Sequence, residues 1–199
     1  MRGILLAGRG RKLMLNLKTI IEDSDFTFEN KLVSIVAMRD CSKIEIGGLS
    51  VGPFEEGQEY KVRFWIAKEL ERTGIARVRD EELLDTVRLY KIQWTERVQS
   101  VMQITSLSED FYPKLRRYIR RLKKDALRDP DRMREYERAR RWAQDILNCR
   151  LKKIIALASS SKLTNQFIGN LTIEERWLYE QLRKMIEEWR SNILKVKNE

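Results

Sequence analysis

The first part of the chain, residues 14–63, has the hydrophobic pattern of short β-strands. Residues 32–38 are almost continuously apolar, as in a buried strand, and residues 43–46 alternate polar and apolar side chains, as in a half-buried one. A third run, residues 60–63, follows a turn at Gly52-Pro53. We therefore expect a small β domain over residues 14–63, which is near the lower size limit for independent stability and relies on its neighbour.

From Phe64 onward the apolar positions recur with the 3.6-residue period of α-helices. A short helix over residues 64–70 is expected to end at Gly74, and Asp80 is expected to cap a second helix that runs to about Met102. Three further start signals follow: the capping-box pair Ser106/Glu109 before a helix that contains Pro113, the pair Asp129-Pro130, and the capping-box pair Thr172/Glu175. The last two open helices that end near Ser160 and Leu194.

The predicted fold class is α+β, mostly α. A small N-terminal β domain is followed by a helical bundle of about five helices over residues 64–199. Residues 1–13 are expected to be a disordered leader, because the apolar run that begins at Ile4 is too short for a secretion signal. Met1 and Met14 both stay open as the true start. No apolar run approaches the ~20 residues that a membrane span requires.

The composition offers little for catalysis. The 199 residues include no histidine, which removes the commonest general base and the commonest metal ligand. Cys41 and Cys149 are far apart and form no metal-binding pair. The glycine-rich segments 8–12 and 47–52 lack the spacing of a phosphate-binding loop and are interpreted as turns. We expect no enzyme activity, no cofactor and no metal.

The net charge of +10 is confined to residues 114–153, which hold 16 Lys and Arg against 6 Asp and Glu. Residues 114–124 predict an amphipathic helix with one apolar stripe and a cationic remainder. This surface either contacts phosphates without base specificity, or is a solvated face that pairs with acidic residues of its own or a partner chain, which we favour. The candidate face for DNA or an acidic partner is Arg116, Arg117, Arg120, Arg121, Lys123 and Lys124.

Two helical segments carry more apolar surface than one narrow stripe. Residues 151–158 are apolar nearly all round beyond Lys153, and residues 177–193 behave similarly. Such helices lie in a core or in a subunit interface, and the pattern leaves both open. The candidate interface residues are Leu151, Ile154, Ile155, Leu157, Trp177, Leu178, Leu182, Ile186 and Trp189. Phe64, Trp65 and Ile66 are candidates for an interdomain or core anchor.

The order of several short motifs is similar to that of a GINS subunit. These motifs are Gly52-Pro53-Phe54, residues 64–70, Glu82-Leu83-Leu84, residues 107–112, residues 150–155 and residues 171–175. The resemblance covers roughly residues 28–195. It is to the branch whose small β domain comes first, the archaeal Gins-twenty-three type, which is similar to eukaryotic Psf-two and Psf-three.

The resemblance implies a non-catalytic scaffold of DNA replication. The expected partners are a paralogous GINS subunit with reversed domain order in a 2:2 heterotetramer, the MCM helicase, and a Cdc45/RecJ-like protein. ATP hydrolysis would then belong to the helicase ring. A homotetramer stays open, as does nonspecific DNA contact, and the expected location is cytoplasmic and nucleoid-associated. The alternative function is a stand-alone nonspecific nucleic-acid-binding protein that uses the basic helix 114–124.

Overall fold

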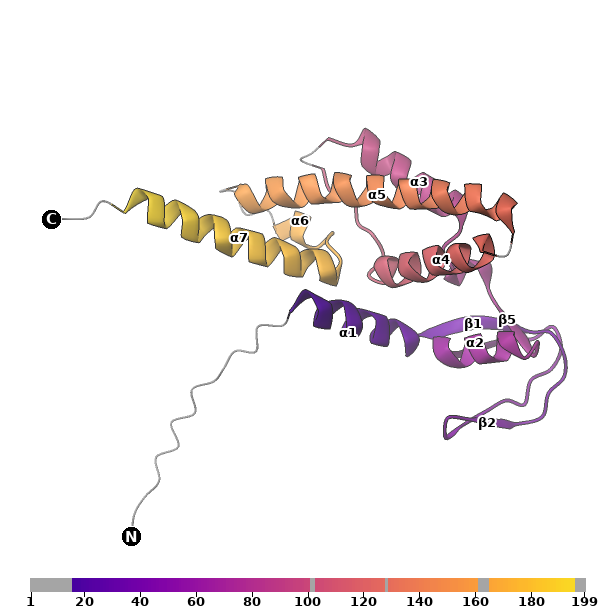
Figure 1. The fold of residues 1–199 in the computed structure, drawn as a ribbon. Helices are drawn as coiled ribbons and strands as arrows, with labels where there is room; N and C mark the ends of the chain where they lie inside the picture. Colours follow the sequence, from indigo (N-terminus) through magenta and orange to yellow (C-terminus); the bar gives the residue numbers. More distant parts are fainter. Residues whose placement is uncertain (1–15, 101–102, 128, 161–164, 196–199) are drawn as a thin grey trace, which may run out of the picture.

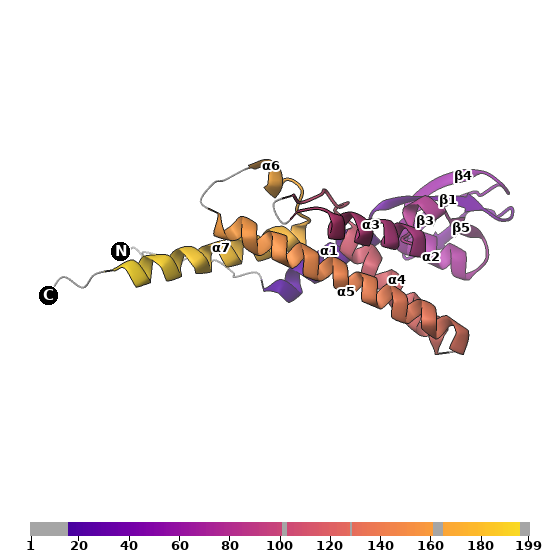
Figure 2. The ribbon, with the colours of Figure 1, turned by 90° about the horizontal axis from the view of Figure 1, so that it is seen from above.

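The strand region at the start of the chain and the helices after it form an elongated molecule (Figures 1 and 2). A computed structural model describes residues 16–100, 103–127, 129–160 and 165–195. The structure is mostly helical, with a small strand region ahead of a helical bundle. This arrangement confirms the predicted fold class. The expected leader and the question of Met1 or Met14 lie outside the described residues.

A three-stranded antiparallel sheet with the order β4-β1-β5 organises the small domain. The central strand β1 (Leu32–Ala37) pairs with β4 (Glu59–Arg63), Leu32 lying opposite Arg63, and with β5 (Ala76–Val78), Ile35 lying opposite Val78. Every second side chain of β1 is buried, which is the pattern of a strand with one face on a core. Helix α2 (Phe64–Arg72) buries Ile66, Ala67 and Leu70 in the same core.

A hairpin of β2 (Ile44–Ile46) and β3 (Leu49–Val51) extends from this sheet domain. Its two turn residues, Gly47 and Gly48, have φ angles of 57° and 77°, which the tightest hairpin turns require at both positions. A Cβ at Gly47 would also lie 2.9 Å from the Trp65 ring. The hydrophobic pattern predicts β1, β2 and β4, whereas β3 and β5 were not predicted.

The range 14–63, expected to form a small β domain, begins with a helix that was not predicted, α1 (Leu17–Glu29). The Asn16 side chain caps this helix by accepting a hydrogen bond from the Lys18 backbone N–H at 2.6 Å. Ile20, Ser24 and Phe28 form its buried face at helical spacing, so tertiary packing stabilises a segment of modest helix propensity. Helix α1 contacts α2, α4 and α7 and thereby joins the small domain to the bundle.

The sheet core crosses the expected domain boundary between residues 63 and 64. Phe64, Ile66, Leu70 and Val78 belong to the same buried cluster as the strands. Helix α2 and strand β5 therefore pack with the small domain, and on this packing we propose a boundary near residue 80.

The third helix starts later than expected. Asp80 lies in a single 3₁₀ turn, η1 (Asp80–Glu82), and Asp85 caps α3 (Thr86–Val98), its side chain accepting from the Arg88 backbone N–H at 2.7 Å. The predicted start at Asp80 was wrong. Asp80 and Asp85 are both suitable N-cap residues followed by residues that favour a helix, so the sequence alone does not distinguish between them. The predicted end, Met102, lies outside the described residues.

The remaining helices follow the predicted order. Helix α4 (Phe111–Ala126) contains Pro113 in its first turn but begins after Asp110, so Ser106 is not its cap. Helix α5 (Pro130–Ser159) is capped by Asp129, and α7 (Ile173–Leu194) opens with the predicted capping box of Thr172 and Glu175. The one-turn helix α6 (Asn165–Ile168) was not predicted.

Helix α5 is the axis of the bundle. Helices α3 and α4 pack on it around Leu89, Leu115 and Ile146, and α7 packs on its later part around Ile154 and Tyr179. None of the described helices combines the length and the hydropathy that crossing a membrane requires.

Candidate interaction surfaces

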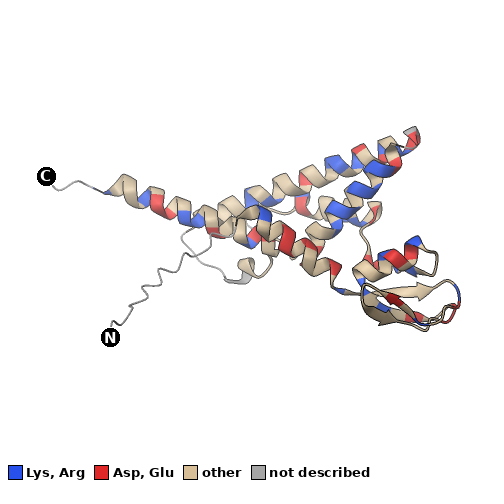
Figure 3. Ribbon diagram, turned by 60° about the horizontal axis from the view of Figure 1, so that its bottom comes forward, with Lys and Arg blue, Asp and Glu red and all other residues tan. Residues whose placement is uncertain are grey.

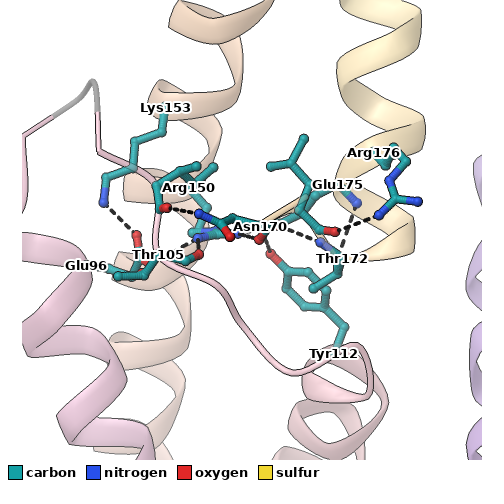
Figure 4. Close-up of polar contacts among 11 residues, drawn as sticks. Glu96, Thr105, Tyr112, Arg150, Lys153, Asn170, Thr172, Glu175 and Arg176 are labelled. Carbon is teal, nitrogen blue, oxygen red and sulfur yellow. Dashed lines mark hydrogen bonds and ion pairs between the residues drawn. The ribbon is translucent and has the colours of Figure 1, made fainter. Parts of the chain in front are cut away.

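A buried cluster of charged side chains joins helices α3, α5 and α7 (Figure 4). Arg150 of α5 is 1% exposed and donates to Glu175 of α7 at 2.8 Å and to Glu96 of α3 at 3.1 Å. Lys153, also buried, donates to the other Glu96 oxygen at 2.7 Å. Two cations and two carboxylates therefore balance inside the protein, as buried charges must.

The same cluster holds the loops that precede α4 and α7. Arg150 donates to the backbone carbonyls of Thr105 at 2.6 Å and Asn170 at 3.2 Å. The Tyr112 hydroxyl donates to Glu175 at 2.6 Å, and its burial, followed by the Glu175 charge, raises the pKa of the phenol well above its usual value. Glu175 also completes the capping box with Thr172, so one carboxylate both starts α7 and anchors it to α5.

Two of the predicted basic-face residues are engaged within the chain. Arg116 donates to Asp25 of α1 at 2.8 Å and lies 3.5 Å from Glu174 of α7. Arg117 donates to Glu29 of α1 at 2.7 Å, and its guanidinium lies 4.7 Å from the centre of the Phe28 ring. These two cations therefore tie α4 to α1, as the interpretation of pairing within the chain expects.

The other four predicted residues point outward. Arg120, Arg121, Lys123 and Lys124 are exposed, and no carboxylate of the described chain lies within ion-pair distance of them. Arg121 alone makes an aromatic contact, 5.5 Å from the centre of the Tyr118 ring. Figure 3 shows how Lys and Arg gather on the paired helices α4 and α5. We call these four residues the outer basic face.

The candidate interface residues divide into covered and exposed groups. Ile154 is buried in the core that α5 and α7 share with α6, and the half-buried residues that pack against this core are Leu157, Leu178, Leu182 and Ile186. Leu151, Ile155 and Trp189 are exposed, Trp189 at 63%, and Trp177 is half-buried. Phe64 and Ile66 lie inside the core of the small domain, and Trp65 packs against it.

Three helices present exposed apolar side chains at helical spacing. On α5 these are Leu147, Leu151 and Ile155, and on α7 they are Met185, Trp189 and Ile193. The third set, on α3, is Val87, Tyr90, Trp94 and Val98, with Trp94 56% exposed. Rows of large apolar side chains on a protein surface mark sites of protein association.

The α3 surface was missed by the sequence analysis, although its signal is present. Positions 87, 90, 94 and 98 repeat every three or four residues, but periodicity identifies an apolar face without saying whether it is covered. Here the opposite side of α3, through Leu89 and Glu96, meets α5. The described residues contain no group of three or more potential metal ligands.

Comparison with known proteins identifies two family models that match different parts of the chain. Residues 83–194 match the GINS complex protein helical bundle domain, and residues 21–79 match the PSF2 N-terminal domain. The human DNA replication complex GINS protein PSF2 is 25% identical over 154 residues, which cover 76% of this chain and 79% of the human protein. The two matched ranges meet where the sheet core ends.

Proposed function

The chain belongs to the GINS family of DNA replication proteins, and we propose that it acts there as a non-catalytic scaffold subunit. The resemblance found in the sequence is thereby confirmed. A scaffold contributes binding energy and geometry, and its surfaces must be rigid and apolar enough to hold partners. The function proposed here is to join other GINS subunits and, through them, to hold the MCM helicase with a Cdc45/RecJ-like protein.

The observation that supports this proposal most strongly is the set of exposed apolar faces on α3, α5 and α7. They lie on helices that the Arg150 cluster locks together, so their relative positions are fixed before a partner binds. Preorganised apolar surface lowers the entropic cost of association. Trp94 and Trp189 are the residues most suited to dominate such contacts, because tryptophan is enriched at interface hot spots.

The proposed partner for these faces is a paralogous GINS subunit with reversed domain order, in a 2:2 heterotetramer. We also propose that the protein acts inside the cell, close to the chromosome. We expect the full chain, co-expressed with that paralogue, to give a native mass equal to two copies of each. A monomer that fails to co-purify with the paralogue would contradict the proposal.

Two substitutions test which faces assemble. Trp189→Glu and Trp94→Glu each place a charge in an exposed apolar row and are expected to weaken assembly by about 2–4 kcal/mol. Leu127→Glu is the control, because Leu127 is an exposed large apolar residue, even more exposed than the two tryptophans, but follows α4, outside the three rows. Dissociation of the complex on dilution, followed by mass photometry, measures the difference.

The outer basic face supports the alternative function, nonspecific binding to nucleic acid. Four exposed cations on one helix, which have no carboxylate partner among the described residues, would track phosphates, and binding would fall steeply with salt. Arg116 and Arg117 do not extend this surface, since α1 engages them, and Tyr118 is buried and offers no stacking face. Single-stranded DNA binding that survives Arg120→Glu with Arg121→Glu would exclude this face.

A further inference from the structure

A cleft of about 310 Å³ separates the small domain from α4. Phe28 and Phe64 of the small domain lie on one side, Tyr118 of α4 lies on the other, and Leu83 and Leu84 of the connecting segment complete the apolar lining. This volume is at the small end for ligand sites and is suited to one or two side chains. None of the three exposed apolar rows contributes to it.

Cations dominate the rim of this cleft. It is lined by Lys68, Lys114, Arg117, Arg120, Arg121 and Lys124, against the two carboxylates of Glu29 and Glu71. Three of the cations are engaged inside the molecule: Arg117 and Lys68 with Glu29, and Lys114 with Asp110 at 3.3 Å. The remaining three, from the outer basic face, have no carboxylate partner within the described chain. The rim therefore favours an anionic ligand.

One acceptor in the cleft also lacks a partner. Glu29 lines the cleft, and its Oε2 is buried without a hydrogen bond in the described structure, while Oε1 meets Arg117. Because this oxygen has almost no accessible surface, a ligand donor pairs with it only when the Glu29 side chain turns towards the cleft. A backbone N–H of an extended peptide supplies such a donor, and a phosphodiester backbone has none.

We propose that this cleft binds an extended acidic peptide segment of a partner protein. One apolar side chain of the peptide packs against the half-buried Leu83 at the edge of the cleft, and the peptide carboxylates meet Arg120, Arg121 and Lys124. Single-stranded nucleic acid fits less well, because Phe28, Phe64 and Tyr118 are almost fully buried and present no ring face on which a base stacks. The proposal is independent of the assembly through α3, α5 and α7.

The test uses the full chain, in whatever assembly it forms, and a fluorescein-labelled peptide with one Leu flanked on both sides by alternating Asp and Glu. Fluorescence anisotropy measures its affinity. We expect Arg121→Glu with Lys124→Glu to weaken binding at least about tenfold, because two attractive charges become repulsive. Replacing the peptide Leu by Ser is expected to weaken binding by about tenfold as well.

The matched control is Lys123→Glu with Arg134→Glu. It changes the net charge equally, on exposed residues of α4 and α5 that do not line the cleft, and it should alter the affinity less than about twofold. Equal weakening by both pairs would overturn the proposal, since the attraction would then be long-range. An affinity that does not change when the peptide Leu is replaced would also overturn the proposal. Tighter binding of an oligothymidylate of equal charge than of the peptide would overturn it as well. Circular dichroism verifies that all variants stay folded, and native mass separates a loss of assembly from a loss of peptide binding.

Discussion

The basic stretch 114–153 contains two kinds of cation, those paired with carboxylates inside the molecule and those exposed on its surface. The inner cations, Arg116, Arg117, Arg150 and Lys153, each meet carboxylates of other helices. The outer basic face, on the same helix α4 and only four to eight residues from Arg116, meets none among the described residues. The paired cations of this segment therefore stabilise the fold, and the unpaired cations create a positive electrostatic potential that can attract anionic partners.

The difference teaches how net charge should be interpreted. The +10 of the segment suggests a continuous cationic surface, but a cation that is paired or buried contributes little to the field outside. Which cations are paired depends on tertiary structure: α1, far away in the sequence, supplies Asp25 and Glu29 to α4. Four predictions test this division, and the first concerns the most buried cation.

Arg150→Met should give the largest loss of stability. The substitution leaves Glu96 and Glu175 with fewer partners inside the core, which typically costs about 3–5 kcal/mol. Urea unfolding followed by circular dichroism measures the free energy of unfolding. Arg121→Met, on the outer basic face, is the control and should change it by less than about 0.5 kcal/mol. Equal losses of stability from the two substitutions would contradict the distinction between paired inner cations and unpaired outer ones.

Arg117→Met should give an intermediate loss of about 1–2 kcal/mol. It removes a partly buried ion pair with Glu29 and a contact with the Phe28 ring, and both connect α4 to α1. Arg120→Met is the neighbouring control without an ion pair. The same unfolding experiment measures both, and a neutral Arg117→Met would show that α1 is held by its apolar contacts alone.

The outer basic face should dominate binding to a polyanion. Arg120→Ala with Lys123→Ala is expected to lower the affinity for heparin by about tenfold at moderate salt, because two available charges are removed. Arg116→Ala with Arg117→Ala removes the same charge but from paired positions and should have the smaller effect. Isothermal titration at several salt concentrations provides the comparison. The reverse ranking would mean that the paired arginines are available after all.

The smallest expected effect is a change in acid stability at Asp110. Burial alone would raise the pKa of this carboxyl, but Lys31 and Lys114 together hold it below its ordinary value of 3.8. Because the folded pKa is the lower one, the stabilisation is present above the ordinary value and disappears as the pH falls through the folded pKa. Asp110→Asn should therefore flatten the loss of stability below about pH 4. An unchanged pH profile, from unfolding curves at stepwise lower pH, would contradict this assignment.

Much of the fold follows from local signals in the sequence. Asp129-Pro130 and the Thr172/Glu175 capping box position two helix starts correctly, because both motifs act within one helical turn. Helix α1 was missed because the β pattern after it dominated the interpretation, although Asn16 is a good cap residue and Ile20, Ser24 and Phe28 recur every four residues. Strand β5 is a short segment between two helical regions, and its pairing with β1 defines it as a strand.

The candidate surfaces were less predictable, since exposure is a tertiary property. Ile154 and Ile155 are adjacent and chemically identical, but Ile154 is buried against α7 and Ile155 is exposed. Arg117 and Arg120 likewise share one helix, and only the position of α1 separates their roles. The assignment of Ile155 and Trp189 to an interface stays a prediction.

Hydrogen–deuterium exchange, measured on the chain alone and in complex with its paralogue, tests the scaffold account most directly. The account predicts slower exchange on assembly along α3 and at residues 147–155 and 185–194, with little change at residues 120–124. Protection confined to residues 120–124, with the three apolar rows unchanged, would contradict it.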